Sequence, residues 1–230
     1  MAMKTIFITG GARGIGKAIA FECFKRGIKQ IVITAKTEEI LFETKEMLSK
    51  MGAKILAFKA DVRNIEVMKR VFNETIKTFG KIDILINNAG IAQRKLFIEI
   101  TPSDWDEIID TNLKGIFICT YLVLPYMIAR KDGIIINIAS GAGKTGFPEL
   151  SIYCASKFGV VGFTEALAKE LKNLGIKVYA ICPGGTDTRM YRSLFPERKP
   201  LYGPEKVAKV VSELIFGERT VPLGYCVEVY

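Results

Sequence analysis

KTIFITGGARGIG, at residues 4–16, decides the fold of this chain. Residues 4–9 are largely apolar and β-branched, which predicts a strand, and apolar side chains recur at helical spacing from Ile15 onward. Glycines at 10, 11, 14 and 16 fill the short connection between the two. A strand that turns through glycines directly into a helix is the first half of a βαβ unit, so we expect a parallel sheet.

The glycine turn is suited to hold a phosphate. Glycines allow a close backbone approach to a pyrophosphate, and the free N–H groups of the following helix attract its negative charge. The spacing is Gly-x-x-x-Gly-x-Gly instead of Gly-x-Gly-x-x-Gly, and an ordinary strand-to-helix turn is the alternative. The residues expected to contact a dinucleotide here are Gly10, Gly11, Ala12, Arg13, Gly14, Ile15 and Gly16.

Short apolar runs alternate with helix-period stretches along the rest of the chain. The predicted strands are 4–9, 30–35, 54–59, 82–87, 133–139, 176–182 and 225–229. The predicted helices are 15–26, 38–51, 64–79, 103–130, 152–173 and 204–216. Several strands are almost wholly apolar, as in a parallel sheet covered by helices on both faces. We therefore expect one domain over residues 1–230 with a doubly wound α/β fold.

Two segments depart from this regular pattern. Pro125 lies in the second half of the 103–130 helix and is expected to kink it. Residues 184–203 hold few periodic apolar residues and contain Pro196 and Pro200. Long irregular loops often cover a site, so this stretch is expected to be a mobile lid with one helical turn.

Composition narrows the class of protein. The 230 residues carry a net charge of +9, but the cations are dispersed among acids, which fits solvated helices and an anionic cofactor better than nucleic acid. We find no apolar run approaching the roughly 18 residues that cross a membrane, and the N-terminal apolar stretch is too short for a signal peptide. The expectation is a cytoplasmic protein.

The cysteine pattern argues against both a metal site and a disulfide framework. The chain has no histidine, and its cysteines are odd in number and widely spaced. Most of them are expected to be small buried apolar residues. They are Cys23, Cys119, Cys154, Cys182 and Cys226.

The choice of cofactor is expected to depend on the end of the second strand. NAD enzymes commonly place an acid about 20 residues after the glycine turn, where it binds the 2′-hydroxyl of the ribose. Here that segment contains Lys36, and the first acid is Glu38. Lys36 and Arg13 would attract a 2′-phosphate, so NADP(H) is favoured. NAD(H) is the alternative if Lys36 is only a solvated surface residue.

Tyr153 and Lys157 form a Tyr-x-x-x-Lys pair near the start of a predicted helix, where residues i and i+4 share one face. An ammonium beside a phenol lowers its pKa from about 10, so Tyr153 could exchange a proton with a carbonyl or alcohol oxygen. Ser140 follows the fifth strand, at the sheet edge where ligands bind, and could hold the same oxygen. An ordinary surface helix pair is the alternative.

Together, these features resemble the short-chain dehydrogenase/reductase family in its principal, single-domain form. The resemblance covers residues 5 to about 188, with its motifs in family order. It implies a Rossmann-like sheet of about seven strands in the order 3-2-1-4-5-6-7 and an NADP(H)-dependent oxidoreductase. The motifs are TGGARGIG at 9–16, Asp61-Val62, Asn87-Asn88-Ala89-Gly90, Asn112, Ser140, Tyr153 with Lys157, and Pro183-Gly184 with Thr186.

The resemblance also implies roles for these residues. Positions 61–62 resemble the pair that contacts the adenine, 87–90 the stretch that supports the sheet and lines the ribose, and 183–186 the turn that cups the nicotinamide. Asn112 resembles the residue that anchors a water in a proton relay, and Lys157 the lysine that binds the ribose hydroxyls. The cofactor-side residues so assigned are Asp61, Val62, Asn88, Ala89, Gly90, Tyr153, Lys157, Pro183, Gly184 and Thr186.

The sequence also departs from the family pattern at the substrate side. Gly185 stands where a bulkier residue is common, which predicts a looser wall, and the tail lacks a frequent Asp-Gly-Gly ending, which predicts a truncated last strand. The residues expected to shape the substrate pocket are Gln93, Arg94, Ala142, Gly143 and Phe147.

Three functions follow as hypotheses. The first is an NADPH-dependent carbonyl reductase, with a 3-oxoacyl group on an acyl carrier protein as one candidate substrate. The second is an NAD(P)-dependent alcohol or sugar dehydrogenase, and the third is a sensor that binds cofactor without turnover. The cations that could meet an acidic carrier are Arg130, Lys131, Lys169 and Lys172, or these are ordinary helix-end cations.

A homodimer or homotetramer is also expected. The helices at 103–130 and 152–173 resemble those that pair between subunits in the family. Their apolar residues could face a partner subunit or the sheet of the same chain; they are Phe117, Tyr121, Phe158, Phe163 and Leu167.

Overall fold

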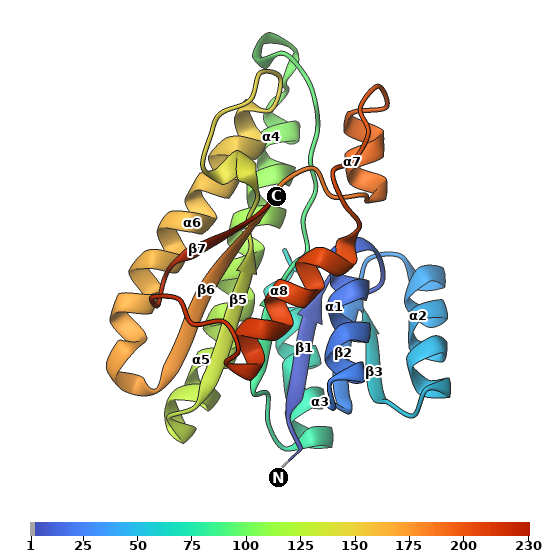
Figure 1. Ribbon diagram of the computed structural model, residues 1–230, viewed down its shortest axis with the longest axis vertical. Helices are drawn as coiled ribbons and strands as arrows, with labels where there is room; N and C mark the ends of the chain where they lie inside the picture. The colour runs from blue at the N-terminus through green and yellow to red at the C-terminus, as the bar shows by residue number, and fades with distance from the viewer. Residues whose placement is uncertain (1–2) are drawn as a thin grey trace.

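A seven-stranded parallel sheet forms the centre of the computed structural model, which describes residues 3–230. The strand order is β3-β2-β1-β4-β5-β6-β7, which confirms the expected order and the doubly wound fold (Figure 1). The strand bounds lie within two residues of those predicted. They are β1 Thr5–Thr9, β2 Gln30–Ala35, β3 Lys54–Lys59, β4 Ile84–Asn87, β5 Gly133–Ile138, β6 Ile176–Pro183 and β7 Cys226–Val229.

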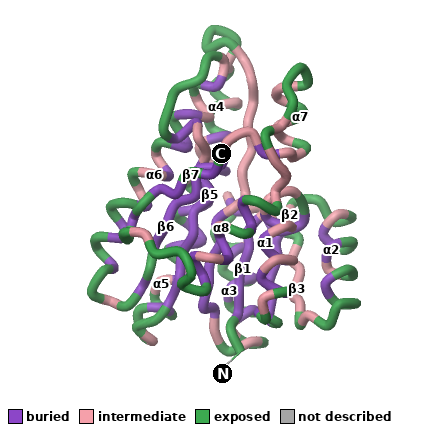
Figure 2. The backbone as a smooth tube through the Cα atoms, viewed as in Figure 1, coloured by how far each residue is buried: buried purple, intermediate pink, exposed green. Residues whose placement is uncertain are grey.

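Helices cover both faces of the sheet, and its central strands are buried (Figure 2). Alternate strand residues belong to two buried layers, one on each face. On β1, Ile6 and Ile8 pack with one layer while Phe7 points to the other, where it stacks on Phe72 with ring centroids 4.4 Å apart. The first face carries α1 Gly14–Lys25, α2 Glu38–Lys50 and α8 Pro204–Phe216. The second carries α3 Ile65–Phe79, α5 Gly115–Arg130 and α6 Ser151–Leu171.

The long predicted helix at 103–130 is interrupted, but not at the expected place. It consists of α4 Pro102–Ile109, a π-helical turn at Asp110–Lys114 and α5, and α5 runs through Pro125 as one helix. A π-helical turn inserts one extra residue per turn and is common at functional sites. The interruption lies near the carboxyl ends of the strands, where Thr111 of this turn borders a cavity.

By length and composition, Pro102–Arg130 is long and apolar enough to cross a membrane. This differs from the expectation that no apolar run in the sequence approaches that length. Pro102–Arg130 is the one such stretch among the described residues. Its residues Ile116, Cys119, Val123 and Met127 are buried in the layers beneath the sheet, as in a core helix.

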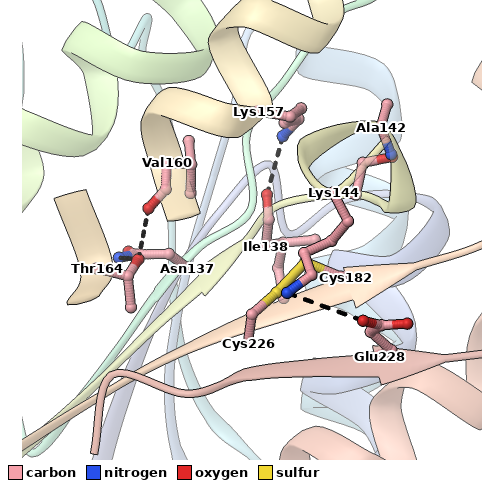
Figure 3. Close-up of a disulfide and its surroundings, with 11 residues drawn as sticks. Asn137, Ile138, Ala142, Lys144, Lys157, Val160, Thr164, Cys182, Cys226 and Glu228 are labelled. Carbon is pink, nitrogen blue, oxygen red and sulfur yellow. Dashed lines mark hydrogen bonds and ion pairs between the residues drawn. A yellow bond between two sulfur atoms is a disulfide. The ribbon is translucent and has the colours of Figure 1, made fainter. Parts of the chain in front are cut away.

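The cysteine expectation is wrong for one pair, because Cys182 and Cys226 form a disulfide between β6 and β7 (Figure 3). Ala180 is the register partner of Cys226, so Cys182 lies two residues further along the same sheet face. The 44-residue separation hides this contact from the sequence. Cys23, Cys119 and Cys154 are free and buried, as expected, and burial raises the pKa of the first two to about 12.

Candidate active site

A cavity of about 610 Å³ opens at the carboxyl ends of the strands. It runs from the glycine turn after β1, past the ends of β2 and β3, to α6 and the segment at 184–203. Most predicted site residues line it together. They are Gly10, Ala12, Arg13, Gly14, Ile15, Lys36, Asp61, Val62, Asn88, Ala89, Gly90, Ser140, Tyr153, Lys157, Pro183, Gly184 and Thr186.

The glycine turn uses its glycines for two different purposes. Gly10 and Gly14 have φ of 62° and 51°, the left-handed region that favours glycine. A Cβ at Gly16 would lie 2.4 Å from the carbonyl oxygen of Gly10, and one at Gly11 would lie 2.6 Å from the Ile33 side chain. Gly11 and Gly16 therefore do not line the cavity but allow α1 and β2 to pack against the turn.

A second stretch, residues 87–88 at the end of β4, supports the glycine turn and the sheet. The Asn88 amide donates to the carbonyls of Thr9 and Gly10 at 2.9 and 3.0 Å, and the Asn88 N–H donates to Oγ1 of Thr9 at 2.9 Å. Asn87 points away from the cavity and donates to Asn137 on β5 at 2.9 Å. Residue 88 thus orders the turn, while residue 87 joins two strands of the sheet.

The turn leaves an anion site open. Among residues 3–230, no side chain caps the first turn of α1, and that turn contains no acid. Its N–H groups and the positive end of the helix dipole therefore remain available to a phosphate. Thr34, at the end of β2, also lines the cavity, and its buried hydroxyl has no hydrogen-bond partner in the described chain. These features fit a dinucleotide.

Lys36 lies within a charged cluster at the ends of β2 and β3. Its Nζ is 3.4 Å from Oδ2 of Asp61 and 3.9 Å from Oε1 of Glu107. Arg63 also binds Asp61, with Nη2 at 2.7 Å and Nε at 3.0 Å from Oδ2. Burial alone raises the pKa of Asp61, but the bonds from Arg63 and the charge of Lys36 outweigh it and lower the pKa to about 2.

Glu38, the first acid after Lys36 in the sequence, is held away from the cavity, so the acids near Lys36 are Asp61 and Glu107 from other segments. Glu38 forms an ion pair with Lys59 at 3.2 Å and does not line the cavity. Arg13 is exposed at the cavity edge and forms no ion pair with any residue in the described range. Two cations, Arg13 and Lys36, therefore border this end of the cavity.

Tyr153, Ser140 and Lys157 meet at the other end. Burial raises the pKa of Tyr153, and a hydrogen bond that the Ser140 hydroxyl donates to its oxygen lowers it only in part. Lys157 is buried, donates to the carbonyl of Ile138 at 2.9 Å, and has its pKa lowered to about 8 by burial (Figure 3). Its Nζ lies 5.7 Å from the Tyr153 ring centre.

The direction of the Tyr153 pKa differs from the one expected from the ammonium alone, because desolvation of the phenolate is the larger effect. At neutral pH Tyr153 is thus a phenol, which is a proton donor. Lys157 is within hydrogen-bonding distance of a backbone carbonyl and close enough to stabilise the phenolate left after donation.

Asn112 lies in the π-helical turn behind these residues and is not itself part of the cavity wall. Its side chain accepts from the N–H of Ile91 and donates to the carbonyl of Ile91, both at 2.8 Å, and donates to Ser156 at 3.1 Å. A Cβ at Gly90 would lie 3.2 Å from Oδ1 of Asn112 and 3.7 Å from Nζ of Lys157. Asn112 therefore joins the loop after β4 to α6, and its role toward a water stays a prediction.

The pocket beside Tyr153 is walled mainly by the 184–203 segment, which contains the short helix α7 Arg189–Leu194. Of the residues expected to shape it, Ala142 and Phe147 do so, while Gly143 packs beneath the carbonyl of Lys157. The lining residues that the sequence did not name one by one include Ile91, Thr145, Leu150, Thr188, Arg189, Met190, Tyr191, Leu194, Phe195, Arg198, Leu201 and Tyr230.

Gly185 and Gln93 also differ from expectation. A Cβ at Gly185 would lie 3.0 Å from the ring of Tyr191, so this glycine makes room for an aromatic wall instead of loosening it. Gln93 points away from the pocket and donates to Asp104 at 3.1 Å. Both outcomes depend on contacts between segments that are distant in the sequence.

The four cations considered for an acidic carrier lie at the far end of the sheet. Arg130 ends α5 and Lys131 follows it, just before β5 begins, and Lys169 and Lys172 lie just before β6 begins, whereas the cavity opens where the strands end. Arg130 donates to the carbonyl of Ile82 at 2.7 Å, which makes it part of the fold.

Known proteins share this arrangement. The model of the short chain dehydrogenase family matches residues 4–199. The chain is 37% identical over 232 residues to a 3-oxoacyl-(acyl-carrier-protein) reductase of Thermotoga maritima, covering 96% of this chain and 94% of that protein. It is 36% identical over 196 residues to one of Staphylococcus aureus, covering 85% and 80%. The crystal structure of levodione reductase matches with a TM-score of 0.91 at 28% identity, covering 98% and 95%. The chain therefore belongs to the short-chain dehydrogenase/reductase family of oxidoreductases.

Proposed function

We propose that the protein is an NADPH-dependent carbonyl reductase, in which Tyr153 donates a proton to the oxygen of an apolar carbonyl substrate. The observation that carries this proposal is the half-buried Tyr153 beside Ser140 and Lys157, at the junction between the glycine-turn end of the cavity and an apolar pocket. A nicotinamide bound between them supplies the hydride.

The side chains around Tyr153 have complementary parts in the reaction. The hydroxyls of Ser140 and Tyr153 lie within hydrogen-bonding distance of each other, so one carbonyl oxygen placed between them, in exchange for that bond, can accept from both. Tyr153 then gives its proton to that oxygen, and the charge on Lys157 stabilises the phenolate. The raised pKa of Tyr153 keeps its hydroxyl protonated before reduction, as a proton donor to the carbonyl oxygen must be.

Preference for NADPH is supported by the charges near the adenosine end. Arg13 and Lys36 border the cavity, and the nearest following acid, Glu38, is paired elsewhere with Lys59. A 2′-phosphate would find two cations there, whereas the 2′-hydroxyl of NADH would find no carboxylate partner from residue 38. Fluorescence titration should give tighter binding of NADPH; equal or tighter binding of NADH would refute this part of the proposal.

The pocket wall favours an apolar substrate over a sugar. Aromatic and aliphatic side chains such as Phe147, Leu150, Tyr191, Leu194 and Phe195 dominate the lining near Tyr153. A sugar would bury several hydroxyls against these rings without hydrogen-bond partners, which costs binding free energy. Ketones, diketones and 3-oxoacyl thioesters all suit such walls, and the last are the substrates named for the curated relatives.

The decisive experiment is a substrate screen. Ketones, diketones, 3-oxoacyl thioesters and sugars are offered with NADPH, and consumption is followed by nicotinamide absorbance. We expect saturable turnover of one apolar class and none of sugars. Tight NADPH binding without any turnover would support a sensor instead, and preferred oxidation of alcohols or sugars would support a dehydrogenase.

An acyl carrier protein is the partner to test if thioesters react. Comparing the same acyl group on carrier protein and on a short thiol measures the contribution of the carrier to kcat/KM. Charge reversal at Lys172 should have no effect on that ratio, because this residue lies at the opposite end of the sheet from the cavity.

Assembly into a homodimer or homotetramer is proposed from exposed apolar side chains on α5 and α6. Phe117, Tyr121 and Phe158 are 40%, 69% and 45% exposed, whereas Leu167 is buried against the sheet. Phe163 packs on Phe117 with ring centroids 4.7 Å apart. Light scattering of the purified protein, which we propose to be cytoplasmic, should give a multiple of 25.5 kDa; a monomeric mass would refute it.

A further inference from the structure

Arg94 joins three positions that are far apart in the sequence. Its Nε donates to Oε2 of Glu149 at 2.7 Å, and its Nη1 donates to Oε1 of Glu197 at 2.9 Å and to the carbonyl of Leu194 at 3.2 Å. Glu149 precedes α6, whereas Leu194 and Glu197 belong to the lid segment at 184–203. We call Arg94, Glu149 and Glu197 the Arg94 clamp.

One side of the clamp adjoins the catalytic helix. Glu149 has φ of 64°, a left-handed conformation that residues other than glycine rarely adopt. Such a conformation persists where its surroundings fix it. Here the N–H of Lys95 donates to the Glu149 carbonyl at 2.9 Å, while Arg94 holds its carboxylate. Two residues later α6 begins, and its first turn carries Tyr153.

The other side of the clamp adjoins the pocket wall. Leu194 and Phe195 line the cavity at the end of α7. The guanidinium of Arg94 lies 5.2 Å from the ring centre of Phe195, and the Tyr191 ring packs against the same ring at 5.3 Å. Phe195 in turn packs on a small buried cluster that Tyr153 also contacts, formed by Ala142, Leu150 and Cys154. Arg94 thus holds an aromatic wall against the base of the catalytic helix.

We propose that Arg94 is a positioning residue that sets the affinity for substrate by fixing the apolar wall of Leu194 and Phe195. This inference rests on the proposed function, which places the apolar part of a carbonyl compound against that wall. Arg94 does not line the cavity and touches no reacting atom. Its planar fork reaches a carboxylate in one direction and a carboxylate plus a carbonyl in another, a geometry that the single ammonium of lysine cannot reproduce.

The clamp should act on binding more than on overall stability. Ion pairs that are this exposed contribute little to the free energy of unfolding. Within the described chain, however, the bonds from Arg94 are the only hydrogen bonds or ion pairs that join residues 187–201 to the chain outside 184–203, and the other contacts of the wall are apolar packing. Loss of the clamp should therefore increase the local mobility of Leu194 and Phe195 without a large change in the free energy of unfolding of the whole protein.

Arg94→Gln tests the proposal. We expect KM for the best carbonyl substrate to rise about tenfold, the size of one lost charged hydrogen bond, with kcat and the Kd of NADPH within about twofold of wild type. Hydrogen exchange of the amides at 187–201 should become faster. Arg94→Lys should recover only part of the affinity.

Two further variants separate the clamp from a general effect of lid charges. Arg192→Gln removes an ion pair that lies wholly within the lid, with Nε of Arg192 at 2.5 Å from Oδ1 of Asp187, and should leave KM unchanged. Glu197→Gln should raise KM. Its effect should not add to that of Arg94→Gln, because both variants remove the same ion pair between Arg94 and Glu197.

The outcomes distinguish the inference from the function beneath it. Unchanged KM or unchanged exchange in Arg94→Gln would overturn the clamp, as would a parallel loss of kcat and NADPH affinity. If the wild-type protein reduces no carbonyl compound, the proposed function fails, while the exchange rates still decide whether Arg94 holds the lid.

Discussion

The two halves of the cavity are built in different ways. The cofactor half consists of backbone turns and short side chains that follow directly after strands, such as Gly10, Asp61 and Ala89. The substrate half consists of large side chains on a segment that is held by contacts between distant residues, as at Arg94. The cofactor half is formed by residues that are close in the sequence, so its residues can be recognised as sequence motifs. The substrate half depends on contacts between segments that are distant in the sequence, so no sequence motif predicts it.

Tyr153→Phe should separate the halves most strongly. Removing the proton donor should lower kcat for carbonyl reduction about 1000-fold, within the range for general acid catalysis. The phenyl ring keeps the packing, so the Kd of NADPH, measured by fluorescence, should change by less than about twofold. Comparable losses of binding and rate would mean that Tyr153 shapes the cofactor half instead.

The disulfide ties the last strand to the strand that ends in the Pro183-Gly184 turn. Cys226→Ser should lower the free energy of unfolding by about 3 kcal/mol, because a 44-residue separation is no longer closed in the unfolded chain. Denaturant unfolding measures this. A reductant should bring the wild-type protein to the stability of the variant and leave the variant unaffected; equal stability of all forms would show that the bond does not form in solution.

Lys36→Asp sharpens the comparison within the cofactor half. Replacing a cation by a carboxylate should lower the ratio of kcat/KM for NADPH over NADH about 100-fold, as expected for one lost charged hydrogen bond and an added repulsion. Lys69→Asp, on the exposed face of α3, makes the same change of charge away from the cavity and serves as the control. If Lys36→Asp uses NADPH as well as wild type does, the cofactor argument is wrong.

The pH profile should show the smallest effect. The lowered pKa of Lys157, about 8, means that its charge is present below that pH and lost above it, while the raised pKa keeps Tyr153 protonated. The rate constant kcat for reduction should therefore fall above pH 8, by about tenfold per unit, as the phenolate loses its stabilising charge. The fall should be absent from Lys157→Met, and a wild-type rate that rises above pH 8 would contradict the assignment.

Most of the fold followed from local pattern. The alternation of apolar residues with periods of 2 and 3.6 predicted all seven strands and six helical stretches, one of which is divided into α4 and α5. The pattern is informative because the buried face of each strand or helix carries apolar residues at that period. The site motifs were equally local: Gly14, Lys157 and Pro183 each lie within a few residues of a strand or helix end. The pattern did not place the expected helical turn of the 184–203 segment, because α7 has six residues and is too short to show a period, and it missed the π-helical turn between α4 and α5.

The sequence alone thus determined the parallel sheet, the glycine turn and the Tyr153–Lys157 pair, because each arises from residues that are neighbours along the chain. Only the tertiary structure decided the raised pKa of Tyr153, the bond between Cys182 and Cys226, and the clamp at Arg94. Each of these depends on burial or on a distance between segments that lie more than 10 residues apart. Burial and distances of this kind are defined only in the folded chain, where segments far apart in the sequence come into contact.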